Sequence, residues 1–222
     1  MIKACIFDLD GTLAYTLDSM AAVGNQVAEK FGLKPMPVEN YKYYCGNGAD
    51  MLVKRLLLDA GDKELVHYEE ARALYRKKFD KDPFYKIQHY PGMPETLKTL
   101  KQNGVKLGVC SNKPHEAAVK VVKRMFGDQI FDMVMGQSDS VRKKPAPDGP
   151  LKTAQAFGVL PEECMYLGDS GTDMQTGKAA GMYTVGVLWG YREKEELLKN
   201  GADALVESPE DILDLYEEKC SK

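Results

Sequence analysis

The sequence predicts an α/β fold, a doubly wound (Rossmann-like) parallel sheet with a small helical domain inserted after its first strand. From about residue 90 onward, short apolar runs alternate with helix-like segments, which is the pattern of repeated β–α units. Most of these runs are apolar at nearly every position, as expected for strands buried on both faces of a parallel sheet. Residues 14–88 interrupt the alternation and show only helical patterns.

The expected core strands follow one another along the chain at residues 4–7, 105–110, 131–135, 165–167 and 183–188. Between the later strands, the sequence predicts crossover helices at residues 94–102, 114–126, 150–157 and 173–180. Gly104 and Gly158 follow two of these helices, in the position where glycine commonly ends a helix. The inserted segment is expected to hold helices at residues 17–31, 38–44, 49–60 and 64–80. We therefore expect an α/β core formed by residues 1–13 and 89–222, and a helical insert formed by residues 14–88.

Composition excludes several classes of protein. The chain of 222 residues is 44% hydrophobic, and its net charge of −3 is too balanced for a dedicated nucleic-acid or membrane-surface binder. Its longest apolar runs are far shorter than the roughly 18 residues needed to span a bilayer. Five dispersed cysteines without a CxxC pair are typical of reduced thiols. We therefore expect a cytoplasmic protein with no nucleic-acid or membrane partner.

Polar residues gather where the expected strands end. The first strand is followed by Asp8-Leu9-Asp10-Gly11-Thr12, the second by Ser111-Asn112-Lys113, and the fourth by Gly168-Asp169, with Asp173 shortly after. Lys143-Lys144 precede Pro145 in the loop after the third strand. Because ligands bind beyond the carboxyl ends of the strands in open α/β sheets, we expect these residues to form one site.

The residue types in this site indicate phosphoryl chemistry with a divalent cation. Four carboxylates at one edge need a cation, and Mg²⁺ prefers hard oxygen ligands and often bridges carboxylates to a phosphate. A carboxylate beside a metal and a phosphoryl group can act as nucleophile, and a second one two residues on can act as general acid and base. Taken singly, each element also fits a turn, a helix cap or a surface charge. The order of all four along the chain is what favours a catalytic site.

This order of motifs resembles the haloacid dehalogenase-like hydrolase superfamily over nearly the whole chain. The resemblance implies that Asp8 is the nucleophile and a Mg²⁺ ligand. It implies that Asp10 is the general acid/base, with its backbone carbonyl also on the metal. The same resemblance implies that Asp169 and Asp173 bind the metal, and that Ser111 and the catalytic Lys144 hold the phosphoryl oxygens. Thr12 and Asn112 are expected to contact the substrate. A helical cap inserted after the first motif is a feature of the same superfamily, and residues 14–88 fit it.

Asp10 indicates one reaction type within the superfamily. Phosphatases and phosphomutases need an acid/base there because their leaving group is an alkoxide or hydroxyl, whereas dehalogenase relatives lack this aspartate and the ATPase branch carries Thr. The resemblance therefore implies a phosphatase or mutase and excludes the halide reaction. One departure concerns the hinge to the cap, where relatives usually carry an acidic residue and this chain has Ala14-Tyr15-Thr16.

The segment from Cys45 to Arg55 favours a particular substrate. It reads CGNGADMLVKR and is similar to the GNGAD…L…R cap segment of phosphoglycolate phosphatases. On that resemblance, Gly46, Asn47, Gly48 and Arg55 are expected to bind the substrate, and 2-phosphoglycolate is the expected ester. The same stretch also fits a turn between helices followed by an amphipathic helix.

Several other functions stay open on the sequence. The same core would serve an inorganic pyrophosphatase or a sugar or nucleotide monophosphate phosphatase and, with a different cap, a β-phosphoglucomutase or a phosphonate hydrolase. A non-catalytic phospholigand-binding protein is the alternative from another class, but it would not need both Asp8 and Asp10. The choice among Mg²⁺, Mn²⁺ and Co²⁺ and the oligomeric state also stay open.

Overall fold

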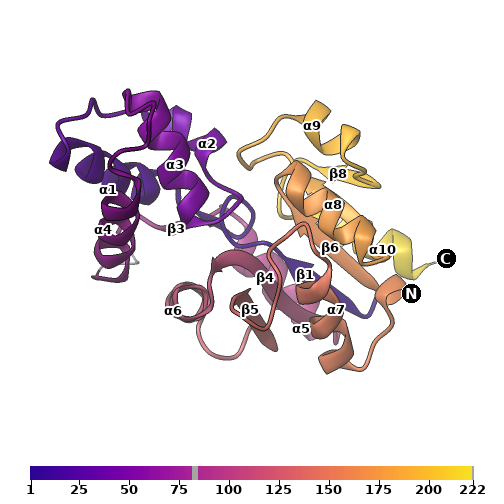
Figure 1. Ribbon diagram of the computed structural model, residues 1–222. Coiled ribbons are helices and arrows are strands. Elements are labelled where there is room, and N and C mark those ends of the chain that lie inside the picture. Colours follow the sequence, from indigo (N-terminus) through magenta and orange to yellow (C-terminus); the bar gives the residue numbers. More distant parts are fainter. Residues whose placement is uncertain (82–84, 222) are drawn as a thin grey trace. The chain divides into compact units, whose positions relative to one another are not determined.

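The computed structural model describes residues 1–81 and 85–221 (Figure 1). The chain divides into two compact units, one formed by Met1–Tyr15 with Gln88–Lys222 and the other by Thr16–Ile87. These boundaries lie one or two residues from the expected ones, because Ala14–Tyr15 (β2) pairs with Gln88–His89 (β3) and both strands stay with the first unit. The chain leaves the first unit and returns to it through this antiparallel ribbon.

The first unit contains a parallel sheet that is six-stranded over the described residues, in the order β5-β4-β1-β6-β7-β8. Its strands are Ala4–Phe7 (β1), Lys106–Pro114 (β4), Met133–Gln137 (β5), Cys164–Gly168 (β6), Tyr183–Val187 (β7) and Ala204–Val206 (β8). The chain winds outward from β1 in both directions, so the predicted doubly wound α/β fold is confirmed. Strand β8 was not predicted from the sequence, because it is only 3 residues long and is partly exposed.

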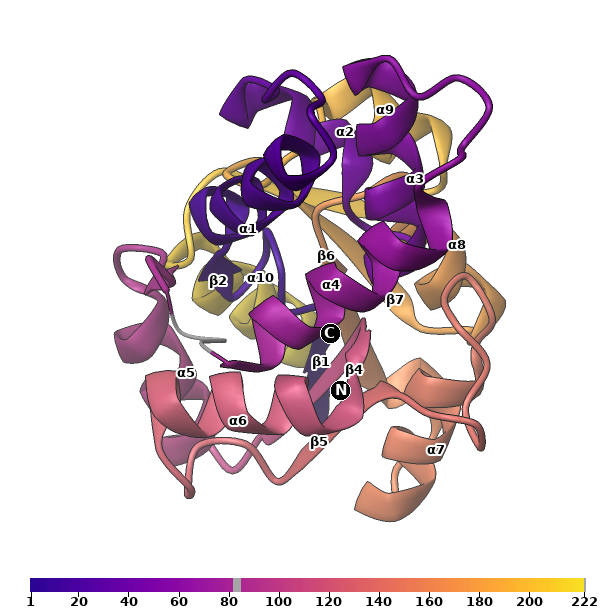
Figure 2. The ribbon, with the colours of Figure 1, turned by 60° about the vertical axis from the view of Figure 1, so that its left-hand side comes forward.

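The helices of the first unit lie on both faces of the sheet (Figure 2). They are Met93–Gln102 (α5), His115–Phe126 (α6), Asp148–Phe157 (α7), Gly171–Ala179 (α8), Lys194–Lys199 (α9) and Asp211–Cys220 (α10), with a 3₁₀ turn at Pro161–Glu163 (η2). Helix α5 packs against α10, whereas α7 packs on β1, β4 and β5. Gly108 in β4 permits the close approach of α7, because a Cβ there would lie 2.7 Å from the methyl group of Thr153.

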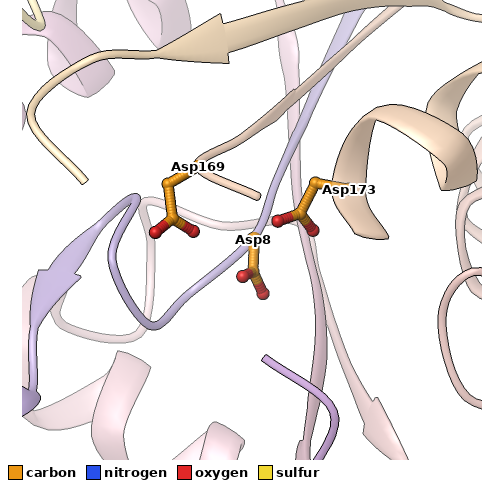
Figure 3. A group of neighbouring side chains, drawn as sticks. All are labelled: Asp8, Asp169 and Asp173. Atoms are coloured by element: carbon orange, nitrogen blue, oxygen red, sulfur yellow. The ribbon is translucent and has the colours of Figure 1, made fainter. Parts of the chain in front are cut away.

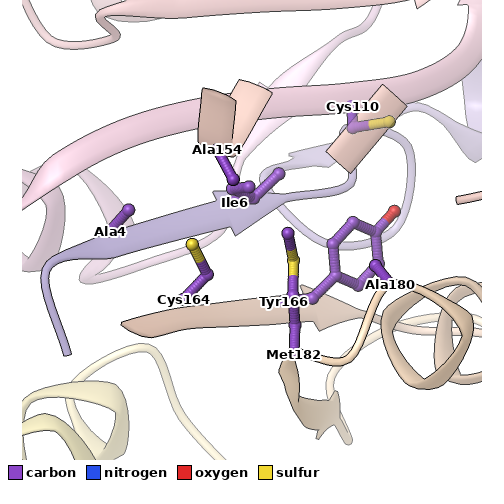
Figure 4. Packing of buried hydrophobic residues seen from close by; sticks show 8 residues of the cluster. All are labelled: Ala4, Ile6, Cys110, Ala154, Cys164, Tyr166, Ala180 and Met182. Atoms are coloured by element: carbon purple, nitrogen blue, oxygen red, sulfur yellow. The ribbon is translucent and has the colours of Figure 1, made fainter. Parts of the chain in front are cut away.

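Alternate residues of β1 contribute to the buried core, and the same alternation continues to the carboxyl edge of the sheet. One core cluster consists of Ala4, Ile6, Cys110, Ala154, Cys164, Tyr166, Ala180 and Met182 (Figure 4). Ala4 and Ile6 contribute to this cluster from alternate positions of β1, as side chains on one face of a strand do. Asp8 is the next residue in that alternation, so the strand that builds the core also delivers this carboxylate to a buried position.

The second unit is helical. Its elements are Leu17–Lys30 (α1), Val38–Asn40 (η1), Tyr41–Tyr44 (α2), Ala49–Ala60 (α3) and Tyr68–Lys81 (α4). Helix α4 begins later than expected, because the Asp62 carboxylate accepts hydrogen bonds from the N–H groups of Val66 and His67 in the preceding turn. Asn25 in α1 holds the segment after this helix: its Nδ2 donates to the Met36 carbonyl and its Oδ1 accepts from the Met36 N–H, each at 2.8 Å.

Within the ranges 1–81 and 85–221, no helix is long and apolar enough to cross a membrane. The five cysteines are free thiols, and four of them are buried.

Candidate active site

Three carboxylates meet at the carboxyl ends of β1 and β6. Asp8 directly follows β1, Asp169 directly follows β6, and Asp173 lies in the first turn of α8. All three are buried, and one oxygen from each lies within 4.8 Å of the others (Figure 3). The parallel register explains the meeting, because Phe7 pairs with Leu167 and the residues after both strands therefore reach the same edge.

The backbone around these carboxylates holds them in place. Gly11 (φ 91°) and Gly190 lie against Asp169 so closely that a Cβ on either would collide with its carboxylate. The N–H of Tyr191 donates to Asp169 Oδ2 at 2.8 Å. On the other side, the N–H of Ser170 donates to Asp173 Oδ2 at 3.1 Å, as part of the N-terminal cap of α8. Asp169 and Asp173 are therefore oriented by the main chain.

Lys144 is the counter-charge for two of the three carboxylates. Its Nζ lies 2.7 Å from Asp8 Oδ1 and 2.6 Å from Asp173 Oδ1. The backbone of Lys144 is held by Asn112, whose Oδ1 accepts from the Lys144 N–H at 2.8 Å and whose Nδ2 donates to the Lys144 carbonyl at 3.3 Å. The structure therefore places the Asn112 amide on the Lys144 peptide, and the substrate contact expected of Asn112 stays a prediction.

Burial shifts the pKa values in this cluster. It raises the pKa of Asp8 to about 7, with Lys144 opposing the shift and Asp173 adding to it. Burial, followed by the charges of Asp173 and Asp8, holds the pKa of Asp169 well above its usual range. For Lys144, burial acts to lower the pKa, but the attraction of Asp173 and Asp8 outweighs it and raises the pKa well above the ordinary value. The lysine therefore stays charged beside carboxylates that are costly to ionise.

This donor set fits a divalent cation such as Mg²⁺. Three ionised carboxylates and one ammonium group carry a formal charge of −2, and all the available ligands are hard oxygens. Asp8 Oδ1, although 2.7 Å from the Lys144 ammonium, makes no well-aligned hydrogen bond to any described residue. Asp8, Asp169 and Asp173 are therefore the side chains that would hold the ion, and the backbone carbonyl of Asp10 is a further predicted ligand.

Oxygens of Asp10 and Thr12 add acceptors at the same edge. Asp10 Oδ1 and Thr12 Oγ1 are buried and have no hydrogen-bond partner in the part of the chain that the structure describes. Ser111 Oγ accepts from the N–H of Lys113 at 3.2 Å and so keeps its own proton available. Buried polar atoms without partners are costly. A bound phosphoryl oxygen would accept a hydrogen bond from the Thr12 hydroxyl, whereas Asp10 Oδ1 needs a donor, such as a water molecule, or a proton of its own that it can donate.

The sequence alone assigned no role to three residues of this edge. Lys113, which the sequence placed at this edge without a role, pairs with Asp10. Its direction could not be read from strand alternation, because the register of β4 is irregular between Cys110 and Pro114. Gly190 and Tyr191, which position Asp169, follow β7 without any motif, so only the fold brings them to the site.

The four residues expected in the cap lie in the second unit. Gly46 (φ 97°) and Gly48 (φ 87°) form the turn before α3, in conformations that favour glycine. The Arg55 guanidinium donates to Asn47 Oδ1 at 2.8 Å and to the carbonyl of Tyr43 at 3.1 Å. Arg55 therefore orders this turn, and contact of these residues with the substrate stays a prediction.

Comparison with known proteins agrees with this geometry. The sequence profile of the haloacid dehalogenase-like hydrolases matches residues 5–187. The chain belongs to the haloacid dehalogenase-like hydrolase family. A phosphoglycolate phosphatase of Aquifex aeolicus is 31% identical to this hydrolase over 216 residues, which is 97% of each chain. One of Pseudomonas putida is 32% identical over 215 residues, or 96% of this hydrolase and 76% of the relative.

Solved structures of the family superpose on this hydrolase. The crystal structure of a presumed phosphoglycolate phosphatase from Lactobacillus delbrueckii subsp. bulgaricus has a TM-score of 0.88 and 31% identity, and the match covers 95% of this hydrolase and 96% of that chain. The family resemblance predicted from the motifs is thus confirmed, and with it the prediction that the chain is a hydrolase.

Proposed function

We propose that this hydrolase is a Mg²⁺-dependent phosphatase that releases phosphate from a small monoester, 2-phosphoglycolate, through a phosphoaspartate on Asp8. The observation that carries the proposal is the buried Asp8 carboxylate, which pairs with Lys144 and lies within the carboxylate cluster. The name shared by the Aquifex aeolicus and Pseudomonas putida relatives supports 2-phosphoglycolate as the substrate.

The chemistry divides between Asp8 and Asp10. A carboxylate oxygen of Asp8 attacks phosphorus, the bond from phosphorus to the ester oxygen breaks, and Asp10 donates a proton to that leaving oxygen. Water then attacks the same phosphorus, Asp10 takes up a proton from the water, and the bond from phosphorus to Asp8 breaks. Inorganic phosphate leaves, and both aspartates return to their starting states.

The remaining residues bind and orient the phosphoryl group. The Lys144 ammonium and the Ser111 hydroxyl would hold phosphoryl oxygens, and Thr12 Oγ1 offers a further polar contact. Lys144 also offsets the charge of Asp8, which otherwise repels an anionic substrate. When bound, Mg²⁺ would offset the charge that develops on the phosphoryl oxygens.

The second unit would act as the cap that selects the ester. Gly46 and Gly48 both adopt positive φ in the turn before α3, a backbone conformation that favours residues without a side chain. A turn without bulky side chains suits close contact with a small organic group. Arg55 would keep the turn in shape through its bonds to Asn47 and Tyr43.

The test is phosphate release from 2-phosphoglycolate and from pyrophosphate, measured side by side with Mg²⁺. We expect kcat/KM of about 10⁴–10⁸ M⁻¹s⁻¹ for 2-phosphoglycolate alone. High activity on pyrophosphate, or weak rates on both, would keep the phosphatase chemistry and overturn the substrate, and a panel of sugar and nucleotide monophosphates would follow. Turnover by a pure Asp8→Asn variant would overturn the phosphoaspartate.

We further propose that the enzyme works in the cytoplasm on small phosphorylated substrates, without a nucleic-acid or membrane partner. The free state of all five cysteines supports a reducing compartment.

A further inference from the structure

Lys113 is a second buried lysine at the catalytic edge of the sheet. It lies in β4, two residues after Ser111, and is 8% exposed. Its Nζ lies 2.9 Å from Asp10 Oδ2, and the two side chains are only 5% and 15% exposed. Lysines are almost never fully buried unless they are paired, so a buried lysine at this position requires an anionic partner.

The ion pair leaves Asp10 with two unequal oxygens. Oδ2 carries the contact with Lys113, whereas Oδ1 is buried and has no hydrogen-bond partner among residues 1–81 and 85–221. The terminal torsion of an aspartate is broad, so a contact at one oxygen is needed to fix the direction of the other. Proton transfer depends on that direction, because a general acid must lie within hydrogen-bond reach of the leaving oxygen.

The two buried lysines of the site serve different carboxylates. Lys144 contacts Asp8 and Asp173, whereas Lys113 contacts Asp10. Lys144 lies beside Asp8, the residue that would carry the phosphoryl group, whereas Lys113 lies beside Asp10. Lys144 is therefore placed to act on the phosphoryl group, and Lys113 is placed to act on the acid/base Asp10.

We propose that Lys113 is a positioning residue that aims Asp10 at the leaving oxygen of the substrate. This inference rests on the phosphatase activity proposed above and adds to it a residue for the proton-transfer step. It follows that Lys113 matters most for esters whose leaving oxygen must be protonated. An aryl phosphate with a good leaving group departs largely without a proton and should depend on Lys113 much less.

The experiment compares Lys113→Met with the wild type on 2-phosphoglycolate and on p-nitrophenyl phosphate. The measured quantity is kcat/KM with Mg²⁺, because it reports the steps up to release of the leaving group. We expect a loss of about 10- to 100-fold on 2-phosphoglycolate and of less than about threefold on p-nitrophenyl phosphate. Lys178→Met removes a lysine–aspartate pair (2.8 Å to Asp203) outside the site and is the matched control, expected to change neither value.

A double-mutant cycle separates positioning from substrate binding. In an Asp10→Asn background, Lys113→Met should reduce kcat/KM by less than about threefold, because Lys113 acts through Asp10. A loss of the same size with and without Asp10 would instead make Lys113 a substrate-binding group. Equal losses on the two esters would make its role structural, and either result would overturn the inference.

A variant that does not fold and a wild type without phosphatase activity each have a defined consequence. If Lys113→Met does not fold, as judged by circular dichroism, Lys113→Arg replaces it in the same comparison, and equal losses on the two esters overturn the inference there as well. A wild type that hydrolysed no phosphate ester would overturn the proposed function together with this inference. An active wild type with parallel losses in the variant would overturn the inference alone.

Discussion

Removal of the Asn112 amide should misplace Lys144 without altering that lysine. Asn112→Ala deletes the bonds to the Lys144 N–H (2.8 Å) and to the Lys144 carbonyl (3.3 Å), and leaves two buried backbone groups without these partners. Each such group costs about 1–3 kcal/mol, and the longer bond counts at the low end of that range. We therefore expect the free energy of unfolding to fall by about 2–4 kcal/mol, measured by urea denaturation.

The effect on catalysis follows from the tight placement of the Lys144 ammonium. It lies 2.7 Å from Asp8 and 2.6 Å from Asp173, so a shift of its backbone would break both ion pairs. Misplacement by about 1 Å can cost about 100-fold in rate, so we expect kcat to fall about 10- to 100-fold, with a smaller change in KM. Asn112→Asp is nearly isosteric but sets a carboxylate oxygen against the Lys144 carbonyl, so it should be no more active than Asn112→Ala.

A matched control and a double mutant complete the assay. Asn25 makes a similar pair of bonds to the backbone of Met36 in the second unit and also accepts from the Tyr41 hydroxyl, so Asn25→Ala should cost at least comparable stability but leave kcat on p-nitrophenyl phosphate within a few-fold of wild type. In a Lys144→Met background, Asn112→Ala should add little further loss of kcat. Additive losses of kcat in the double mutant, or a rise in KM alone, would refute the reasoning and indicate that Asn112 binds the substrate directly.

Four further results are expected. Asp8→Asn should abolish phosphate release while its Tm stays at or above that of wild type, because the variant lacks a buried carboxylate whose pKa burial raises to about 7. Gly190→Ala should weaken Mg²⁺ binding at least about tenfold in calorimetry, because its Cβ would displace Asp169; unchanged affinity would remove Asp169 from the metal site. Arg55→Ala should raise KM for 2-phosphoglycolate and spare p-nitrophenyl phosphate, whereas equal effects on both would confine Arg55 to a structural role. Chelation by EDTA should abolish activity and lower Tm, and added Mg²⁺ should restore both.

The sheet and the carboxylate cluster were predictable because both follow from short-range rules. Apolar runs of about five residues are typical of buried parallel strands, and parallel strands deliver the residues after them to one edge. That argument requires only the order of the elements, and it places Asp8, Asp169 and Asp173 together without knowledge of any side-chain conformation.

The contacts of Asn112 and Lys113 were not predictable for the opposite reason. β4 pairs with β5 through a register irregularity between Cys110 and Pro114, so the simple alternation of side chains fails where these residues lie. Which partner each side chain meets then depends on the loop that carries Lys144 and on the loop that carries Asp10. The same holds for Gly190, whose role appears only when the end of β7 is folded against Asp169.

The charges of the site also constrain how it can bind an anion. When all four carboxylates of this edge are ionised, they and the two ammonium groups carry a formal charge of −2, equal in size to the charge of one divalent cation; the groups are Asp8, Asp10, Asp169, Asp173, Lys113 and Lys144. Both lysines are already paired with carboxylates, so most of the positive charge that they offer a phosphate dianion is offset. A phosphoryl group that enters this edge therefore meets net repulsion unless a cation is bound there first. Substrate affinity, and not turnover alone, should consequently depend on the cation.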